Sequence, residues 1–508
     1  METANHPSVV IIGSGLGGLL CGALLAREGC RVTILEKAPE AGGCLQTFQR
    51  YGIPFETGFH TLGGFFPGSP MQRLLRSVGA WDAVAPHIVP LDADGFDEVH
   101  LHGRCYRLPA GRDRFTAALA GYFPEEKEQI EAYMDEVYRL CDLIPLFDLR
   151  MPDPVRPVHP DLSGRSVKQF IESYVHNPEL RELLAWNNTL YGGDLFTPDF
   201  VAALVTKMYI EGAVRLRDGS RCLADALQQA IVSHGGQVLT NREAVRIEAD
   251  RQTVSAVYTQ DGGCFRADWY ISSLHPADMV RLLPEGAFPA AYRNRLAGLR
   301  NSYSLFTLFL VLKPDTVPYI NRNIYHYTGD SSVWEAGDYT LGDFPRGLMV
   351  MTPPMAGDNR FARKMIVHCI MRQDSVKAWQ DSVHGARPEA YERFKADCTA
   401  RVFAALRSIF PEIDTAVMHH FAATPLTLQH YLSLADAAIY GTVHDYRQLY
   451  ASFLSVRTKI SNLLLTGQSV KLHGICGVPV TAVETCGAIT GLDVLLRHIA
   501  NDSINHTA

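Results

Sequence analysis

A cluster of glycines near the N-terminus, followed by one glutamate, has the residue types and spacing that hold a dinucleotide. The run Gly13-Ser-Gly-Leu-Gly-Gly18 comes first, and Glu36 follows about one helix and one strand later. The first glycine of such a fingerprint permits a tight turn, the second lets the backbone approach a pyrophosphate, and the third allows close packing of helix on strand. A carboxylate at the end of the next strand accepts hydrogen bonds from ribose hydroxyls. The cluster therefore predicts a site for a diphosphate and a ribose.

The elements needed to position this cluster are predicted around it in the required order. Residues 9–12 are a short apolar run typical of a central parallel strand, residues 19–28 have helical composition, and residues 30–36 alternate as a second strand. The N-terminus of the helix offers free N–H groups and a partial positive charge to phosphates. Glycine-rich turns also arise for packing alone, but the ordered context strongly favours a binding site.

The same fingerprint is found in nicotinamide dehydrogenases, so naming the cofactor needs a second signal. The adjacent glycines 42 and 43 would let the chain pass close to a diphosphate, and residues 462–467 predict an apolar strand that ends in glycine. Residues 473–482 then lead into a helix. Its N-terminus could sit at the pyrimidine edge of a flavin and favour the anionic reduced ring by about 0.3–1 kcal/mol. The sequence has no second dinucleotide fingerprint, so direct use of NADPH has no support.

These motifs together resemble the FAD-dependent carotenoid desaturase and isomerase family, which includes phytoene desaturase, prolycopene isomerase and retinol saturase. The matching segments are the glycine fingerprint, Glu36-Lys37, Gly42-Gly43, the turn Phe55-Glu-Thr-Gly-Phe-His60, residues 235–247 and residues 474–482. The flavin motifs are specific to the broad family, whereas the central region matches loosely. The resemblance implies an α/β fold with FAD as cofactor. A Rossmann-type FAD-binding domain, like that of amine oxidases and phytoene desaturases, would carry an inserted α+β substrate domain.

The resemblance also implies roles for individual residues at the cofactor. The residues that would hold the diphosphate are Gly13, Ser14, Gly15, Gly17 and Gly18, and Lys37 and Gly43 would lie beside it. Glu36 would bind the adenosine ribose, and the backbone of Val245 would contact the adenine. Gly467 and Gln468 would approach the ribityl chain, and Gly477 and Val478 the flavin ring. Wider amine-oxidase relatives often carry an acid where Gln468 stands. An amide can still bond a ribityl hydroxyl, so the change leaves flavin binding intact.

Two histidines near the expected flavin are the candidates for catalysis. Flavin chemistry on a C–C bond requires the protein to hold the bond against the ring, to exclude water and, where needed, to move a proton. His60 is the first candidate acid–base group, and a structural histidine packed beside the cofactor is an equally weighted alternative. His473 has the same ambiguity, with the structural role favoured. Desaturases often have proline at the position of His60, so the histidine looks more like the isomerase and retinol-saturase branch.

No metal site is expected. His100 and His102 would place two imidazoles on one strand face, but no third ligand is identifiable, so a polar strand face is favoured. His419 and His420 would point to opposite faces of an extended chain. The sequence also has no G-x-S-x-G elbow, so an esterase has no support.

The composition of the 508 residues describes an ordinary globular protein. The sequence has 47 Lys plus Arg and 54 Asp plus Glu, which gives a net charge of −7. This balance does not indicate a nucleic-acid-binding protein, which would be expected to have an excess of basic residues. The 11 cysteines include no C-x-x-C pair, so neither a disulfide framework nor a zinc ribbon is expected, and the reducing cytoplasm fits best. The longest apolar stretch is broken by glycines, so a soluble protein, or one attached to a membrane surface, is expected.

Two interleaved domains are expected. The FAD-binding domain would comprise residues 1–105, 213–285 and 455–508, and the substrate domain residues 106–212 and 286–454. The predicted function is an FAD-dependent oxidoreductase that saturates, desaturates or isomerises C–C double bonds of an apolar polyene by hydride exchange with the flavin. One alternative is a flavin amine oxidase, whose aromatic cage cannot be located from the sequence. The other is a non-catalytic isoprenoid escort protein, against which the intact C-terminal flavin segment speaks.

The expected partner is an apolar small molecule, a carotenoid or a retinoid, and not a nucleic acid. Residues 143–147 and 65–67 would line an apolar tunnel or touch a membrane surface, although core packing explains such runs more often. Polyisoprenoids dissolve in bilayers, so peripheral membrane contact stays open. The substrate, the direction of reaction and the external electron donor or acceptor also stay open.

Overall fold

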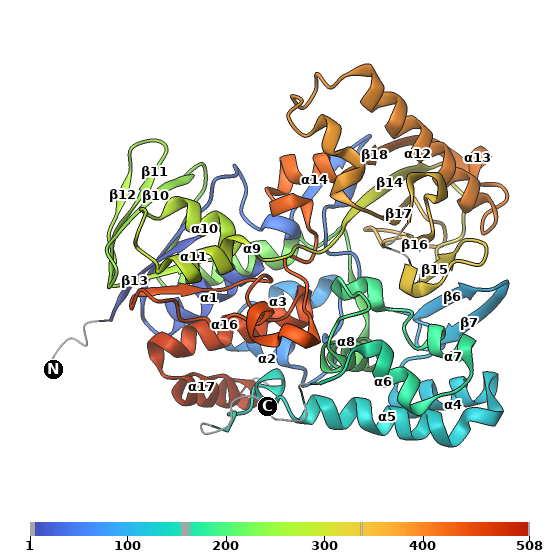
Figure 1. Cartoon of the computed structure of the whole chain (residues 1–508), viewed down its shortest axis with the longest axis horizontal. Coiled ribbons are helices and arrows are strands. Elements are labelled where there is room, and N and C mark those ends of the chain that lie inside the picture. The colour runs from blue at the N-terminus through green and yellow to red at the C-terminus, as the bar shows by residue number, and fades with distance from the viewer. Residues whose placement is uncertain (1–5, 154–161, 163, 336, 338, 506–508) are drawn as a thin grey trace.

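The structure is a computed structural model that describes residues 6–153, 162, 164–335, 337 and 339–505. Its two largest sheets have five and seven strands. In Figure 1 the blue N-terminal, yellow-green middle and red C-terminal segments come together on the left, around the five-stranded sheet. The seven-stranded sheet lies at the right, above a layer of helices. Segments far apart in the sequence therefore build the left-hand unit together.

The five-stranded sheet is parallel throughout, with the order β19-β13-β1-β2-β9. Its strands are β1 (Ser8–Ile12), β2 (Arg31–Leu35), β9 (Gln237–Leu239), β13 (Trp269–Ser272) and β19 (Leu463–Leu465). The apolar residues of the central strand β1 are buried on both faces, as in parallel sheets that helices cover on both sides. This order of parallel strands is the expected Rossmann-type arrangement.

Helices and a small antiparallel sheet cover the five-stranded sheet. They are α1 (Leu16–Arg27), α9 (Arg221–Ser233), α16 (Gly474–Thr490), α17 (Leu492–Asn505), β10 (Ala244–Ala249), β11 (Val254–Thr259) and β12 (Cys264–Phe265). Helix α1 is apolar on all sides because it packs against α9 and α16 as well as the sheet, and 11 of its residues are buried. A helix buried in this way holds its N-terminus at a fixed place above β1.

The seven-stranded sheet has the order β18-β14-β17-β16-β15-β6-β7. Its strands are β6 (Asp97–Leu101), β7 (Arg104–Leu108), β14 (Ser304–Leu312), β15 (Asn323–Tyr327), β16 (Gly347–Met351), β17 (Lys364–Met371) and β18 (Val417–Ala423). All neighbours are antiparallel except β15 and β6, which are parallel. Helices α12 (Glu389–Arg407) and α13 (Ile413–Ala416) share a hydrophobic core with this sheet.

A helical layer lies below the seven-stranded sheet in Figure 1. It contains α4 (Arg112–Tyr122), α5 (Lys127–Asp142), α6 (Val167–Tyr174), α7 (Pro178–Leu183) and α8 (Asp199–Gly212). The buried face of α5 packs on α8, which is buried almost all round. The remaining strands and α-helices are β3 (Thr47–Arg50), β4 (Ile53–Glu56), α2 (Pro70–Ser77), α3 (Trp81–Val84), β5 (Ile88–Pro90), β8 (Val214–Leu216), α10 (Pro276–Leu282), α11 (Ala290–Ala297), α14 (Pro425–Leu432) and α15 (Leu449–Ser452).

The division into two interleaved domains stays a prediction. The five strands of the parallel sheet fall within the segments expected for the FAD-binding domain. Strand β7 crosses the expected boundary at residue 105, and both β6 and β7 pair within the seven-stranded sheet.

Within the described ranges no single helix is long and apolar enough to cross a membrane. Helices α16 and α17 reach that length only together, and the chain bends by 119° between them.

Candidate active site

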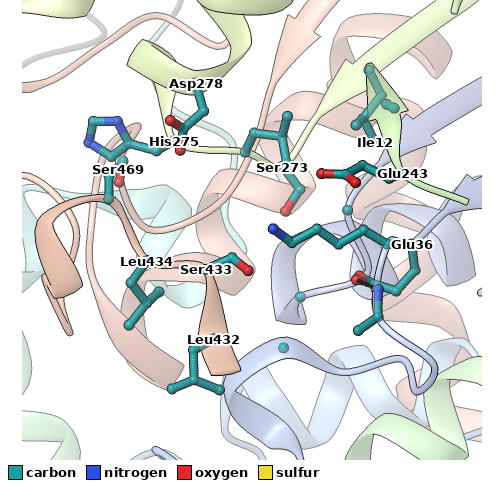
Figure 2. A pocket seen from close by; sticks show the side chains of 18 of the residues that line it. Ile12, Glu36, Glu243, Ser273, His275, Asp278, Leu432, Ser433, Leu434 and Ser469 are labelled. Carbon is teal, nitrogen blue, oxygen red and sulfur yellow. Dashed lines mark hydrogen bonds between the residues drawn. The ribbon is translucent and has the colours of Figure 1, made fainter. Parts of the chain in front are cut away.

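A cavity of about 710 Å³ lies along the carboxyl ends of the parallel strands. Its walls include Ile12 from β1, Glu36 after β2 and Ser273 after β13. Figure 2 shows Glu36 on one side of this cavity and Leu432 and Leu434 on the opposite side. Ligands of open α/β sheets bind at this edge because the helix N-termini and the strand ends meet there.

Most glycines of the first turn are required because a side chain would collide with neighbouring atoms or because the backbone has a positive φ. Gly13 has a φ of +95°, and a Cβ on Gly18 would collide with the carbonyl oxygen of Gly13. A Cβ on Gly17 would lie 3.0 Å from the Cα of Gly467. A Cβ on Gly15, in contrast, would meet no protein atom within 4 Å, although Gly15 lines the cavity. The open space beside Gly15 is therefore where a diphosphate can approach the backbone.

Glu36 is held at the end of β2 by three hydrogen bonds. Its Oε2 accepts from the backbone N–H of Ser14 at 2.9 Å and from the Ser14 hydroxyl at 2.6 Å, and its Oε1 accepts from the N–H of Ala38 at 2.8 Å. The side chain is 9% exposed and lines the cavity. An ionised carboxylate has about four lone-pair sites, so Glu36 can still accept hydroxyls of a ribose.

Three further residues assigned to the cofactor by resemblance, Lys37, Gly43 and Gln468, line the same cavity. Gln468 also lines the neighbouring apolar cavity, so it stands where the two spaces meet. Gly467, with a φ of +99°, packs against Gly17. Their assignments to individual cofactor atoms stay predictions.

The remaining assigned residues do not line this cavity: Ser14, Gly17, Gly18, Val245, Gly467, Gly477 and Val478. Val245 on β10 is 46% exposed, and its neighbours Glu243 and Ala244 line the cavity instead. Gly477 and Val478 are buried in the first turns of α16. A Cβ on Gly477 would collide with Leu472, so packing alone requires this glycine. The predicted contacts of these residues with adenine and flavin remain predictions.

A second cavity, of about 110 Å³, adjoins the first and contains no charged side chain. The two share Leu432, Leu434 and Gln468. None of the described residues that line the second cavity is Asp, Glu, Lys or Arg. A third cavity of about 60 Å³ continues it, with Leu305, Met349 and several other residues common to both. We call the second and third cavities together the apolar channel.

His60 lines this channel next to a second histidine, His368. The two ring centroids are 4.4 Å apart, and the Nδ1 of His60 is buried without a hydrogen-bond partner among the described residues. The Nδ1 of His368 lies 2.9 Å from the hydroxyl of Thr307. Burial, and then the nearby Lys364 and Arg215, lower the pKa of His60 to about 3. Burial also lowers the pKa of His368, so both rings are neutral at neutral pH.

The two cations that act on His60 are themselves buried. The Nζ of Lys364 donates to Glu56 at 3.0 Å and to the carbonyl of Pro54 at 2.6 Å. The guanidinium of Arg215 donates to three backbone carbonyls and to the Oδ1 of Asn323. Glu56 therefore pairs with Lys364, and this pair ties the turn of Glu56 to β17.

A buried polar network fixes Thr61, the neighbour of His60. The Thr61 hydroxyl donates to Asn323 at 2.8 Å, and the Nδ2 of Asn323 donates to Asp97 at 2.7 Å. The indole of Trp186 donates to the other oxygen of Asp97 at 2.8 Å. Burial raises the pKa of Asp97 to about 6 even though these hydrogen bonds oppose it. The network attaches the His60 turn to the seven-stranded sheet.

His473 lies at the start of α16 between two backbone carbonyls. Its Nδ1 is 2.8 Å from the carbonyl of Tyr191, and its Nε2 is 2.7 Å from that of Thr442. Its ring stacks on His444 at 4.3 Å. A neutral imidazole has one N–H, so it donates to one of the carbonyls at a time. Burial lowers the pKa of His473 despite both carbonyls. These contacts favour the structural role of His473. A catalytic role for His473 stays a prediction.

The strand histidine His100 has neighbours that the sequence did not reveal. Cys105 lies directly opposite it on β7, and Oε1 of Glu98 is 2.9 Å from its Nε2. Ligand atoms of these three residues lie within 4.8 Å of one another. The other oxygen of Glu98 accepts from Arg107 and Arg322, and their charges oppose a cation there.

Sequence reasoning missed His368 and Tyr325, both of which line the channel. His368 interrupts an otherwise apolar central part of β17, and Thr307 does the same in β14. Single polar residues within apolar strands were the available signal, because a buried polar side chain needs a partner.

The arrangement fits a flavin dinucleotide. The cavity lies where parallel sheets bind dinucleotides, with backbone exposed at Gly15 and a carboxylate placed for a ribose at Glu36. The apolar channel opens beside Gln468, at the end where the flavin is expected. A bound flavin supplies hydride or electron transfer, and the protein supplies the dry, uncharged space next to it.

Comparison with known proteins supports this fit. The all-trans-retinol 13,14-reductase of Danio rerio is 25% identical over 94% of this chain and 85% of that protein. The human protein of the same name is 27% identical over 98% of this chain and 87% of that protein. The chloroplastic prolycopene isomerase of Arabidopsis thaliana is 23% identical over 85% of this chain and 73% of that protein. The expected resemblance is therefore confirmed.

Solved structures show the same fold. An oxidoreductase from Methanosarcina mazei superimposes with a TM-score of 0.65 at 17% identity, over 94% of this chain and 98% of that one. Putrescine oxidase bound to putrescine gives 0.63 at 13% identity, over 96% and 99%. The model of flavin containing amine oxidoreductases matches residues 16–347. The predicted α/β flavin fold and the predicted FAD cofactor are confirmed. The chain belongs to the family of flavin containing amine oxidoreductases, and it is an FAD-dependent oxidoreductase.

Proposed function

We propose that this enzyme saturates, desaturates or isomerises C–C double bonds of an apolar polyene, a retinoid or a carotenoid. The observation that carries the proposal is the absence of charge from the lining of the apolar channel among the described residues. Burying a hydrocarbon chain there gains about 25 cal/mol for each Å² removed from water. The retinol reductases and the prolycopene isomerase similar to this chain are named for substrates of this class.

An amine substrate fits the channel less well. Alkyl amines are ammonium ions at neutral pH, and burying an unpaired charge is costly. The described channel residues include no carboxylate to pair with an ammonium. The likeness to putrescine oxidase, at 13% identity, concerns the fold alone.

The protein's own part in the reaction is to hold the polyene, exclude water and move a proton. With bound FAD supplying hydride transfer, His60 would take a proton from a substrate carbon or return one to it. Burial lowers its pKa to about 3, so the His60 ring is neutral at neutral pH and is a weak base. Donation in the saturating direction requires His60 to take up a proton first.

Contact with a membrane surface belongs to the same proposal, because polyenes partition into bilayers. Tyr431 near the end of α14 is 61% exposed and lines the cavity of about 710 Å³. The next residue, Leu432, also lines the apolar channel. Co-sedimentation with phosphatidylcholine vesicles tests this contact, and Tyr431→Ser should weaken it. An unchanged bound fraction would remove Tyr431 from the contact.

The experiment that tests the function uses the flavin as its indicator. The purified protein should show a flavin spectrum, and the oxidised enzyme should keep that spectrum when amines are added. After anaerobic photoreduction, all-trans-retinol or a carotene should reoxidise the flavin or be isomerised, with products resolved by chromatography. A colourless protein that FAD cannot reconstitute, or bleaching by an amine, would overturn the proposal.

A further inference from the structure

The inner end of the apolar channel rests on one row of side chains across the seven-stranded sheet. The pairing register places Tyr325 on β15 opposite Met349 on β16, and Met349 opposite His368 on β17. His368 is in turn opposite Thr307 on β14. Residues directly opposite each other in neighbouring strands project from the same face of a sheet. All four side chains accordingly line the channel.

The innermost member of this row has an unsatisfied hydroxyl. Tyr325 is 2% exposed and lines the 60 Å³ cavity, and its hydroxyl has no hydrogen-bond partner among the described residues. The Nε2 of His368, a residue 9% exposed on the boundary of the two cavities, has none either. A buried hydroxyl without a partner lowers the stability of a fold. Its presence here calls for a polar atom on the ligand side.

Two neighbouring tyrosines, in contrast, have a protein partner for the hydroxyl. Tyr327 lines the same cavity, and its hydroxyl donates to the carbonyl of Trp186 at 3.3 Å. The hydroxyl of Tyr303 donates to the carbonyl of Thr189 at 2.9 Å. Most of the remaining wall is aliphatic and offers no partner to Tyr325.

We propose that the inner cavity binds a hydroxyl or carbonyl oxygen at the end of the substrate chain, with Tyr325 as the hydrogen-bond donor. This inference rests on the proposed function and narrows its substrate to a polyene with an oxygenated end. Strands lie about 4.8 Å apart, so the oxygen sits about 10 Å along the sheet from His368. The reacting bond then lies near the pair formed by His60 and His368. A hydrocarbon end would leave the Tyr325 hydroxyl buried and unpaired, which selects against it.

The test compares two polyenes that differ only in the terminal oxygen. All-trans-retinol and the hydrocarbon in which its CH₂OH group is CH₃ are titrated into the FAD-loaded enzyme, and Kd is measured by quenching of protein fluorescence. KM and kcat follow from reoxidation of the photoreduced flavin. The wild type should bind the alcohol about tenfold more tightly, a difference of about 1.4 kcal/mol. Tyr325→Phe should abolish that difference and leave the Kd of the hydrocarbon unchanged.

Tyr327→Phe is the matched control, because it removes a hydroxyl from the same cavity that already has a protein partner. It should retain the tenfold discrimination. Equal binding of both polyenes by the wild type, or an equal loss for both in Tyr325→Phe, would overturn the inference while leaving the proposed function intact. If neither polyene binds, the inference and the proposed function both fall.

Discussion

Thr307 and His368 face each other across β14 and β17, with the threonine hydroxyl 2.9 Å from the Nδ1 of the imidazole. This contact holds a ring whose other nitrogen has no partner among the described residues and whose centroid is 4.4 Å from that of His60. Two neutral imidazoles thus lie next to each other in a channel whose described lining has no charged side chain. The sheet register, rather than any local motif, brings them together.

Removing the hydroxyl of Thr307 should loosen this arrangement. Thr307→Val leaves Nδ1 of His368 unpartnered and should cost about 1–2 kcal/mol in unfolding free energy, measured by urea denaturation of the holoenzyme. We expect kcat to fall with little change in KM, because the ring loses its fixed orientation. Thr307→Ser keeps the hydroxyl and serves as the control. No loss in Thr307→Val would show that the hydroxyl does not hold the ring.

His60→Ala should slow the chemical step without releasing the cofactor. Proton transfer by a positioned side chain contributes about 10²–10⁴-fold, so a loss of at least 10²-fold in kcat is expected. The flavin spectrum and the FAD Kd should stay unchanged. Unaltered turnover would assign His60 a packing role only.

The lowered pKa of His60 predicts how stability varies with pH. The group is neutral in the folded state down to about pH 3, whereas the unfolded chain binds a proton near its ordinary value of 6.5. The unfolded state therefore binds more protons in this window, and stability should fall as pH decreases from 6.5 towards 3. Urea unfolding at pH 7 and pH 5 checks this. His60→Gln, which cannot titrate, should reduce the loss; an identical loss would contradict the lowered pKa.

Two glycines of the first turn provide a matched pair of variants. Gly18→Ala should destabilise the apoprotein, since its methyl group collides with the carbonyl of Gly13. Gly15→Ala meets no protein atom and should leave the apoprotein's Tm unchanged while it weakens FAD binding. Differential scanning calorimetry and FAD titration separate the two effects. If Gly15→Ala binds FAD normally, the diphosphate does not approach at Gly15.

Breaking the buried pair of Lys364 and Glu56 should be costly. Lys364→Met leaves the Glu56 carboxylate buried without its cation, and such losses amount to about 3–5 kcal/mol. The double variant with Glu56→Gln should recover most of that stability, since neither charge remains. Denaturation of the wild type, both single variants and the double variant measures the coupling. If the double variant is no more stable than Lys364→Met, the lost stability comes from packing and not from the unpaired charge.

The nucleotide half of the site was predictable because its signal is local. The turn after β1, the helix and the second strand are adjacent in sequence, and each has its own periodicity and end signal. The largest difference is the helix start, since α1 begins at Leu16 directly after its N-cap Gly15, not at residue 19.

The channel half was not predictable, because its signal is the register between distant strands. Tyr325 and His368 belong to strands that a third strand separates, and nothing in either segment fixes which residues face each other. Cys105 reaches His100 in the same way, across β6 and β7. Chain spacing near one residue cannot report such partners.

The close approach of Gly17 and Gly467 also constrains how the protein is made. Gly467, two residues after β19, must pack against Gly17 of α1, which is synthesised long before it. A nascent chain therefore lacks this contact until residues beyond 467 have left the ribosome.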